Sequence, residues 1–100
     1  MSAQLAEIDE PVHWVEDGVI YVRLAEPLVD PADPNADPVR VLRLDKPKAK
    51  HLRGAPSLED DTAFTLHLNE RCGRLRPSVA GEMSAPDVWR CAAALRPFVA

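Results

Sequence analysis

Few residues in this chain of 100 are able to do nucleophilic chemistry, since it has two cysteines and three histidines. Cys72 and His67 are close in sequence, but five positions on a helix turn through about 500°, which places them on different faces. A cysteine–histidine nucleophilic pair needs both side chains within hydrogen-bond reach. The spacing of the cysteines and histidines also does not resemble a zinc site. We therefore expect no catalytic residue, no metal and no cofactor.

Paired carboxylates and phosphate-binding loops are absent from the sequence pattern as well. Asp60 and Asp61 are adjacent, so on a helix they point about 100° apart and do not form an acid–base dyad. Their favourable interaction with the positive end of a helix explains them sufficiently. The four glycines stand singly at expected turns and form no glycine-rich loop. The sequence predicts a protein that is not an enzyme.

Charge is unevenly distributed along the chain. Residues 1–37 carry a net charge of −8, residues 38–56 carry +5 and residues 57–100 carry −1, which sum to −4. A chain that is acidic overall is a poor general binder of polyanions. The basic segment 40–53 keeps nucleic-acid binding as an alternative, but no aromatic residue interrupts it to stack on a base. A solvated basic face is the simpler interpretation.

Length and composition restrict the class of protein. One hundred residues with 46% apolar and 28% charged side chains are typical of a single small globular domain. The longest apolar runs have four or five residues, whereas a membrane span needs about 20. The first ten residues lack the features of a secretory signal. We expect a cytosolic protein with reduced thiols, composed of a flexible acidic tail (1–10) and one domain (11–100).

The elements that must position any functional residue begin with a predicted β-hairpin. Residues 12–15 and 19–24 are rich in β-branched and aromatic side chains. Between them, Asp17-Gly18 supplies the positive φ angles that tight hairpin turns require. Alternate residues of the second strand are expected to be buried. Pro27 is expected to limit that strand, because it cannot donate a backbone hydrogen bond.

A proline-rich loop and a third strand follow the hairpin. Segment 29–38 contains three prolines, each in an Asp-Pro pair, and predicts a mobile loop. In the third strand, 39–44, the apolar residues change parity between Val41 and Leu42, so we expect a bulge or burial on both faces. No helical crossover separates the strands, which favours an antiparallel sheet.

Helical periodicity replaces the β pattern in the second half of the chain. Residues 46–53 predict one to two helical turns, and Ser57 is expected to cap a helix ending near Gly73. A short turn at 77–83 precedes a last helix capped by Ser84. The predicted fold class is α+β, with a small antiparallel sheet and two main helices packed on one face. The two helices carry apolar stripes, Phe64, Leu68, Cys72 and Leu75 in the first and Val88, Ala92, Leu95 and Val99 in the last.

Trp14, Trp89 and Phe98 are the large aromatic residues whose burial the pattern does not settle. One interpretation is that all three close the core between sheet and helices. The other is that one or more stay exposed as anchors for a protein partner, with arginines of the helices as a rim. The basic segment has the same ambiguity. The candidate partner-binding residues are Trp89, Phe98, Arg71, Arg74, Arg76, Lys46, Lys48 and Lys50.

The order of the elements carries a family resemblance. Leu24-Ala-Glu-Pro-Leu28 and a variable turn precede Val39-Arg-Val-Leu-Arg-Leu-Asp-Lys-Pro-Lys-Ala-Lys-His-Leu-Arg-Gly54, and Met83-Ser-Ala-Pro-Asp87 opens a last helix ending on Phe98. The pattern resembles the small tail assembly chaperones of Mu-like phages and prophages over about residues 19 to 99. The long Asp-Pro loop and the strand at 12–15 depart from the family pattern.

The resemblance implies a non-catalytic chaperone of the bacterial host cytoplasm. Such proteins coat the helix-rich tape measure protein and deliver tail tube subunits, and they are not expected in the mature virion. An amphipathic helix pair is suited to masking apolar stripes of such a partner. The alternatives are a structural tail component retained in the virion, or a small nucleic-acid-binding domain that uses segment 40–53. A homo-oligomer remains open.

Overall fold

The computed structural model describes residues 11–57 and 59–99. They form a three-stranded antiparallel sheet in the order β1-β2-β3, together with helices. The expected acidic tail at 1–10 lies outside the described residues. The elements, in chain order, are β1 (His13–Glu16), β2 (Val19–Leu28), β3 (Val39–Asp45), α2 (Ala49–Leu52), α3 (Asp61–Gly73), α4 (Pro77–Ala80), α5 (Ala85–Leu95) and the 3₁₀ helix η1 (Arg96–Phe98).

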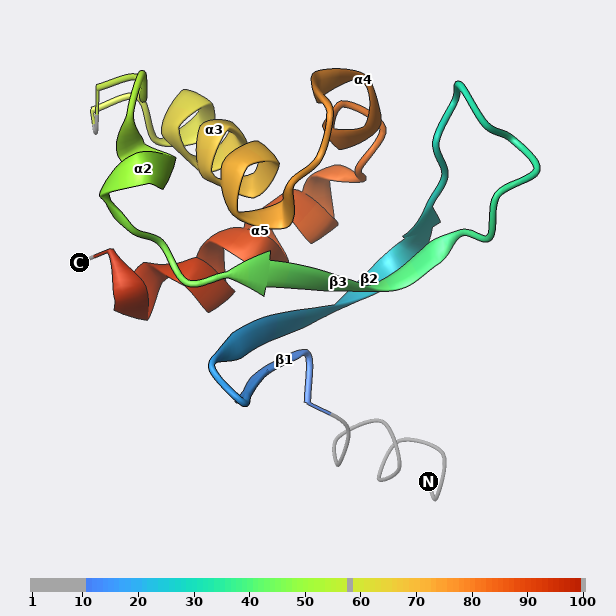
Figure 1. Cartoon of the computed structure of the whole chain (residues 1–100), viewed down its shortest axis with the longest axis horizontal. Coiled ribbons are helices and arrows are strands. Elements are labelled where there is room, and N and C mark those ends of the chain that lie inside the picture. The colour runs from blue at the N-terminus through green and yellow to red at the C-terminus, as the bar shows by residue number, and fades with distance from the viewer. Residues whose placement is uncertain (1–10, 58, 100) are drawn as a thin grey trace.

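The two long helices cover one side of the sheet (Figure 1). Helix α5 contacts β2 and β1, helix α3 contacts β3, and the two helices contact each other. The loop at 29–38 projects from the end of the molecule opposite α2 (Figure 1). The predicted α+β fold with two main helices on one face of an antiparallel sheet is confirmed.

The predicted hairpin forms between β1 and β2. Asp17 and Gly18 have φ angles of 53° and 79°, the two positive values that a tight primed turn requires. The turn pairs Glu16 with Val19, and this register places Ile20 and the alternate residues after it toward the helices. The turn therefore determines which face of β2 enters the core.

We expect Gly18→Ala to lower the free energy of unfolding by about 1 kcal/mol, because a side chain at positive φ costs about 1–2 kcal/mol. No atom outside the adjacent residues lies within 4 Å of a Cβ built at Gly18, so the cost is conformational rather than steric. Urea unfolding of the two proteins measures the difference. Asp17→Asn is the control and should be neutral, since asparagine tolerates this conformation. Equal stability of Gly18→Ala and the unsubstituted protein would contradict the turn geometry.

The expectation that Pro27 limits β2 is wrong, because the strand continues to Leu28. Arg23 pairs with Val41 and Leu28 pairs with Val39, so five steps along β2 oppose two steps along β3. Pro27 lies in this bulged stretch, where the regular ladder is interrupted. A residue without a backbone N–H is tolerated at such a position.

The bulge expected in the third strand lies instead in its neighbour, β2. Strand β3 itself alternates regularly, with Leu42 and Leu44 buried. Val39 and Val41 are each 37% exposed on the opposite face. The change of parity in the sequence therefore reflects apolar residues on an open sheet face, not an irregular strand. The same outer face carries Trp14 stacked on Tyr21, with ring centroids 5.6 Å apart.

The N-cap of α3 is Asp60, which corrects the expectation for Ser57. The Asp60 carboxylate accepts a hydrogen bond from the Ala63 backbone N–H at 3.1 Å. The Ser57 hydroxyl accepts from the Glu59 N–H at 3.2 Å and so closes a local turn ahead of the helix. The helix ends at Gly73 as predicted.

The core consists of aliphatic and sulfur-containing side chains between the sheet and the helices. Phe64, Leu75 and Val79 pack against it while partly exposed. The interpretation in which all three large aromatics close the core is wrong, because Trp89 is 50% exposed and Phe98 is 36% exposed. The buried cluster comprises Ile20, Val22, Leu24, Leu28, Leu42, Leu44, Leu68, Cys72, Met83, Val88, Cys91, Ala94 and Leu95.

Candidate functional site

An apolar groove of about 560 Å³ runs between α3 and the C-terminal part of α5. The wall from α3 includes Phe64 and Leu68, which belong to the apolar stripe predicted for that helix. The floor includes Leu95, which is fully buried in the core. Apolar walls open to solvent are a binding feature, because the exposed apolar area gains free energy when a partner covers it. The complete lining is Asp61, Phe64, Thr65, Leu68, Trp89, Ala92, Leu95, Arg96 and Val99.

Trp89 is the largest exposed apolar side chain of the groove. Val88 and Cys91 of α5 are buried in the core, and Trp89 lies about 100° around the helix from Val88 and about 200° from Cys91, on a different face. Trp89 is 50% exposed and Val99, farther along the groove, is 40% exposed. A large aromatic side chain held at the edge of a groove is the kind of residue that contributes most to protein–protein affinity.

Phe98, the second predicted anchor, does not line the groove. The Lys46 ammonium lies 5.4 Å from the centroid of the Phe98 ring, in a cation–π contact. This contact joins η1 to the segment between β3 and α2. The structure therefore separates the two predicted anchors, and Phe98 helps to hold the C-terminal turn in place.

The three predicted rim arginines also lie away from the groove. Arg74 pairs with Asp45, with Nε and Oδ2 2.8 Å apart, and so joins the end of α3 to β3. Arg76 pairs with Asp30 and so joins the start of α4 to the 29–38 loop. Arg71 is exposed on α3. The polar residues that border the groove are Asp61, Thr65 and Arg96. The sequence did not predict them as site residues, because they belong to no motif.

The predicted lysines of the basic segment do come together. A hollow of about 310 Å³ is lined by the cationic side chains of Lys46, Lys48, Lys50 and Arg74. The hollow also contacts Asp45, the ion-pair partner of Arg74. This cationic hollow and the apolar groove share no lining residue, so they are two separate surfaces.

Buried His51 lies at the base of the cationic hollow. Its Nδ1 accepts a hydrogen bond from the Lys48 backbone N–H at 2.8 Å, which requires an unprotonated Nδ1. Burial, and then the charge of Lys50, lower the pKa of His51 below its ordinary value. Its carbonyl lies 2.9 Å from His67 Nε2, which donates to it. The imidazole of His51 is therefore neutral and closes the start of α2, and its backbone carbonyl links α2 to α3.

The most fully connected buried polar side chain among the described residues is Asp87, in the first turn of α5. Its Oδ1 accepts from the Ala25 N–H at 2.7 Å and its Oδ2 accepts from the Glu26 N–H at 3.1 Å. The Ser84 hydroxyl donates to Oδ2 at 2.9 Å. The Asp87 side chain is 0% exposed. It therefore supplies acceptors to backbone donors of the β2 bulge.

The two thiols are free and buried in the core. Burial is the largest cause that raises the pKa of Cys72 to about 11 and that of Cys91 to about 12, from an ordinary value of 9.0. We expect neither thiol of the native protein to react with Ellman's reagent at about pH 8, where roughly a thousandth or less is thiolate. Both should react at once in denaturant. Rapid labelling of the native protein would contradict the buried placement, and serine variants would identify the exposed thiol.

Within residues 11–57 and 59–99 no three His, Cys, Asp or Glu side chains gather in a way that holds a metal ion. In the same described ranges, no helix is long and apolar enough to cross a membrane. Comparison of the chain with known protein families, curated protein sequences and solved structures gives no match. The structural features that bear on function are therefore the apolar groove and the cationic hollow.

Proposed function

We propose that this protein is a tail assembly chaperone of a Mu-like phage or prophage, and that its groove binds an amphipathic helix of the tape measure protein. The observation that carries the proposal is the open apolar groove between α3 and α5 with half-exposed Trp89 at its edge. The resemblance of residues 19 to 99 to that family supplies the class of partner. The activity is binding, without catalysis, in the host cytoplasm.

The groove has dimensions that suit a helix. Trp89 and Arg96 are seven residues apart, about 10 Å along the helix axis, which is the spacing of positions i and i+7. A helix that presents apolar side chains at i, i+3 or i+4 and i+7 would place them along this length. A tape measure protein has long apolar stripes of this kind before the tail tube encloses them. Covering such a stripe would prevent its aggregation during assembly.

The test uses the tagged full-length chain, co-expressed with the tail tube protein and the long helix-rich protein encoded beside it. We expect purification of the chain to recover the tape measure protein in a stoichiometric complex, with tail tube subunits joining when present. Recovery of neither partner contradicts the proposal. Mass spectrometry of purified particles distinguishes the alternative, because a structural tail component stays in the virion and a chaperone leaves it.

A further inference from the structure

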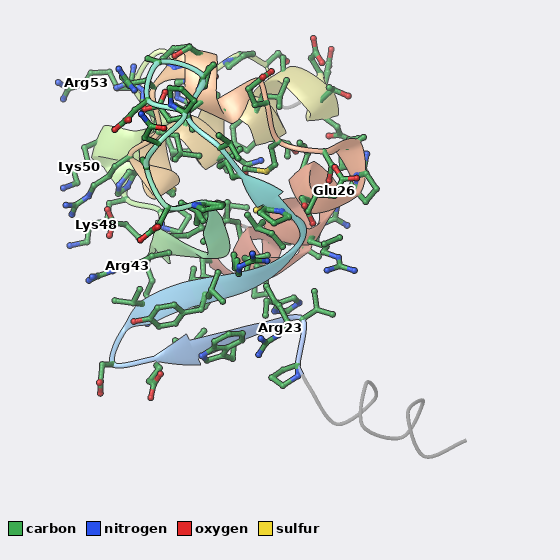
Figure 2. The ribbon with its side chains drawn as sticks, turned by 90° about the vertical axis from the view of Figure 1, so that its right-hand side faces the viewer. Arg23, Glu26, Arg43, Lys48, Lys50 and Arg53 are labelled. Atoms are coloured by element: carbon green, nitrogen blue, oxygen red, sulfur yellow. The ribbon has the colours of Figure 1, made fainter. Side chains whose placement is uncertain are left out.

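The edge of the molecule that holds α2 carries a surplus of positive charge. Figure 2 shows Arg43, Lys48, Lys50 and Arg53 along this edge with their side chains directed away from the body. They come from β3, from α2 and from the residues beside α2. The cationic hollow adds two further cations next to these lysines. We define the basic edge as Arg43, Lys46, Lys48, Lys50, Arg53 and Arg74.

Carboxylates of the described residues neutralise little of this charge. The ion pair found at the basic edge, within residues 11–57 and 59–99, is that of Arg74 with Asp45. Lys46 is directed over the ring of Phe98. The remaining four cations have no ion pair among the residues that the structure describes. Like charges held together repel each other, so a ligand that neutralises them is bound favourably.

The pKa of His51 depends on the charges of this edge. After burial, the charges of Lys50, Lys48 and Arg74 each lower its pKa, and Asp45 opposes them. Because His51 lies behind the cations and keeps a neutral imidazole, a bound anion in front of them would weaken the field and raise its pKa. The histidine is therefore a built-in reporter of occupancy.

We propose that the basic edge is a second docking surface, which binds an acidic segment of a partner protein. Carboxylates are favoured over nucleic acid for two reasons. The aromatic rings beside the cations are already engaged, because Phe98 carries Lys46 over it and Tyr21, which pairs with Arg43, stacks on Trp14. The protein as a whole has a net charge of −4, which opposes a long polyanion more than a short acidic segment. None of the basic-edge residues lines the groove, so this proposal does not rest on the proposed function.

The experiment measures fluorescence anisotropy of a labelled peptide of alternating Glu and Ala, titrated with the full-length protein at about 50 mM and about 300 mM NaCl. We expect binding at low salt that weakens at high salt. Lys48→Glu and Lys50→Glu should each weaken it by about tenfold. Arg40→Glu is the matched control, since it changes the net charge equally but lies at the other end of β3. We expect Arg40→Glu to change the affinity by less than about threefold.

Three outcomes would overturn the proposal. The first is no peptide binding at low salt, and the second is equal loss of affinity in Arg40→Glu and Lys50→Glu. The third is preferential binding of an oligothymidylate with the same number of charges, which would assign the surface to nucleic acid. A nuclear magnetic resonance titration gives an independent readout, because the peptide should raise the pKa of His51, and in Lys50→Glu the same rise should need about tenfold more peptide.

Discussion

Asp87→Ala is expected to lower the free energy of unfolding by about 3–5 kcal/mol, a large part of the stability of a domain of this size. The substitution removes the acceptor of the Ala25 and Glu26 backbone N–H groups, which lie in the bulge of β2. These hydrogen bonds are part-buried, and a donor left without a partner in such a site costs about 1–3 kcal/mol. A domain of this length has a total stability of about 5–15 kcal/mol. Thermal unfolding should shift down by about 15 °C.

We call the hydrogen bonds from the Ala25 and Glu26 N–H groups to the Asp87 carboxylate the clamp, and two further variants separate its contribution from that of the helix cap. Asp87→Asn keeps the size of the side chain, but its amide nitrogen would face a backbone donor, so we expect it to recover only part of the loss. Ser84→Ala removes the capping hydroxyl and leaves the carboxylate, and should cost about 1 kcal/mol. If Asp87→Ala cost no more than Ser84→Ala, the contacts with β2 would contribute nothing to stability.

Trp89→Ala is expected to weaken binding of the tape measure protein by about 30-fold, which corresponds to about 2 kcal/mol. The side chain is 50% exposed in the free protein, so its removal should change the free energy of unfolding by less than about 1 kcal/mol. Loss of binding without loss of stability is the signature of a contact residue. Surface-immobilised full-length protein and the purified tape measure protein provide the measurement.

Phe98→Ala is the matched control for Trp89→Ala. Phe98 is a similarly exposed aromatic residue of the same C-terminal region, but it contacts Lys46 and does not line the groove. We expect its removal to change the affinity by less than about threefold. In a Trp14→Phe background, the fluorescence of Trp89 should shift to shorter wavelength on binding. Equal effects of Trp89→Ala and Phe98→Ala would place the binding surface outside the groove.

The sequence pattern predicted most helices and strands of this fold, because turns, caps and helix ends are determined by residues that are adjacent in the sequence. The turn at Asp17-Gly18, the end of α3 at Gly73 and the cap at Ser84 each depend on a few consecutive residues. The N-cap of α3 was not predicted, because Ser57 and Asp60 are both good capping residues. Pro27 and the position of the bulge were also wrong, because the pairing of β2 with β3 involves residues that are distant in the sequence.

The placement of the site residues was harder to predict, because it depends on contacts between distant segments. Trp89 and Phe98 belong to one short stretch of sequence, yet one borders the groove and the other packs under Lys46. The rim arginines Arg74 and Arg76 pair with Asp45 and Asp30, acids that precede them by 29 and 46 positions. An apolar stripe in the sequence predicts that one face of a helix is apolar. It does not predict which part of that face the neighbouring elements leave exposed to solvent.

Asp87 joins two segments that are distant in the sequence. Leu24-Ala-Glu-Pro-Leu28 forms the bulged part of β2, and Met83-Ser-Ala-Pro-Asp87 begins α5. Asp87 accepts from the Ala25 and Glu26 N–H groups, and Arg90 Nη1 donates to the Arg23 carbonyl at 3.0 Å. The two segments therefore form one structural unit, in which the Asp87 carboxylate accepts hydrogen bonds from backbone N–H groups of the β2 bulge.

The same clamp sets the order in which a newly synthesised chain can fold. The hydrogen bond between Ala25 and Asp87 joins positions 62 residues apart, and that between Arg23 and Arg90 joins positions 67 residues apart. When the hairpin leaves the ribosome, Asp87 has not yet been synthesised. The Ala25 and Glu26 N–H groups can therefore bind the carboxylate only after the start of α5 has been translated. Closing so long a loop is slow compared with forming the hairpin alone. Nascent chains that stop before α5 should remain sensitive to protease, and only chains that include it should accumulate in the folded form.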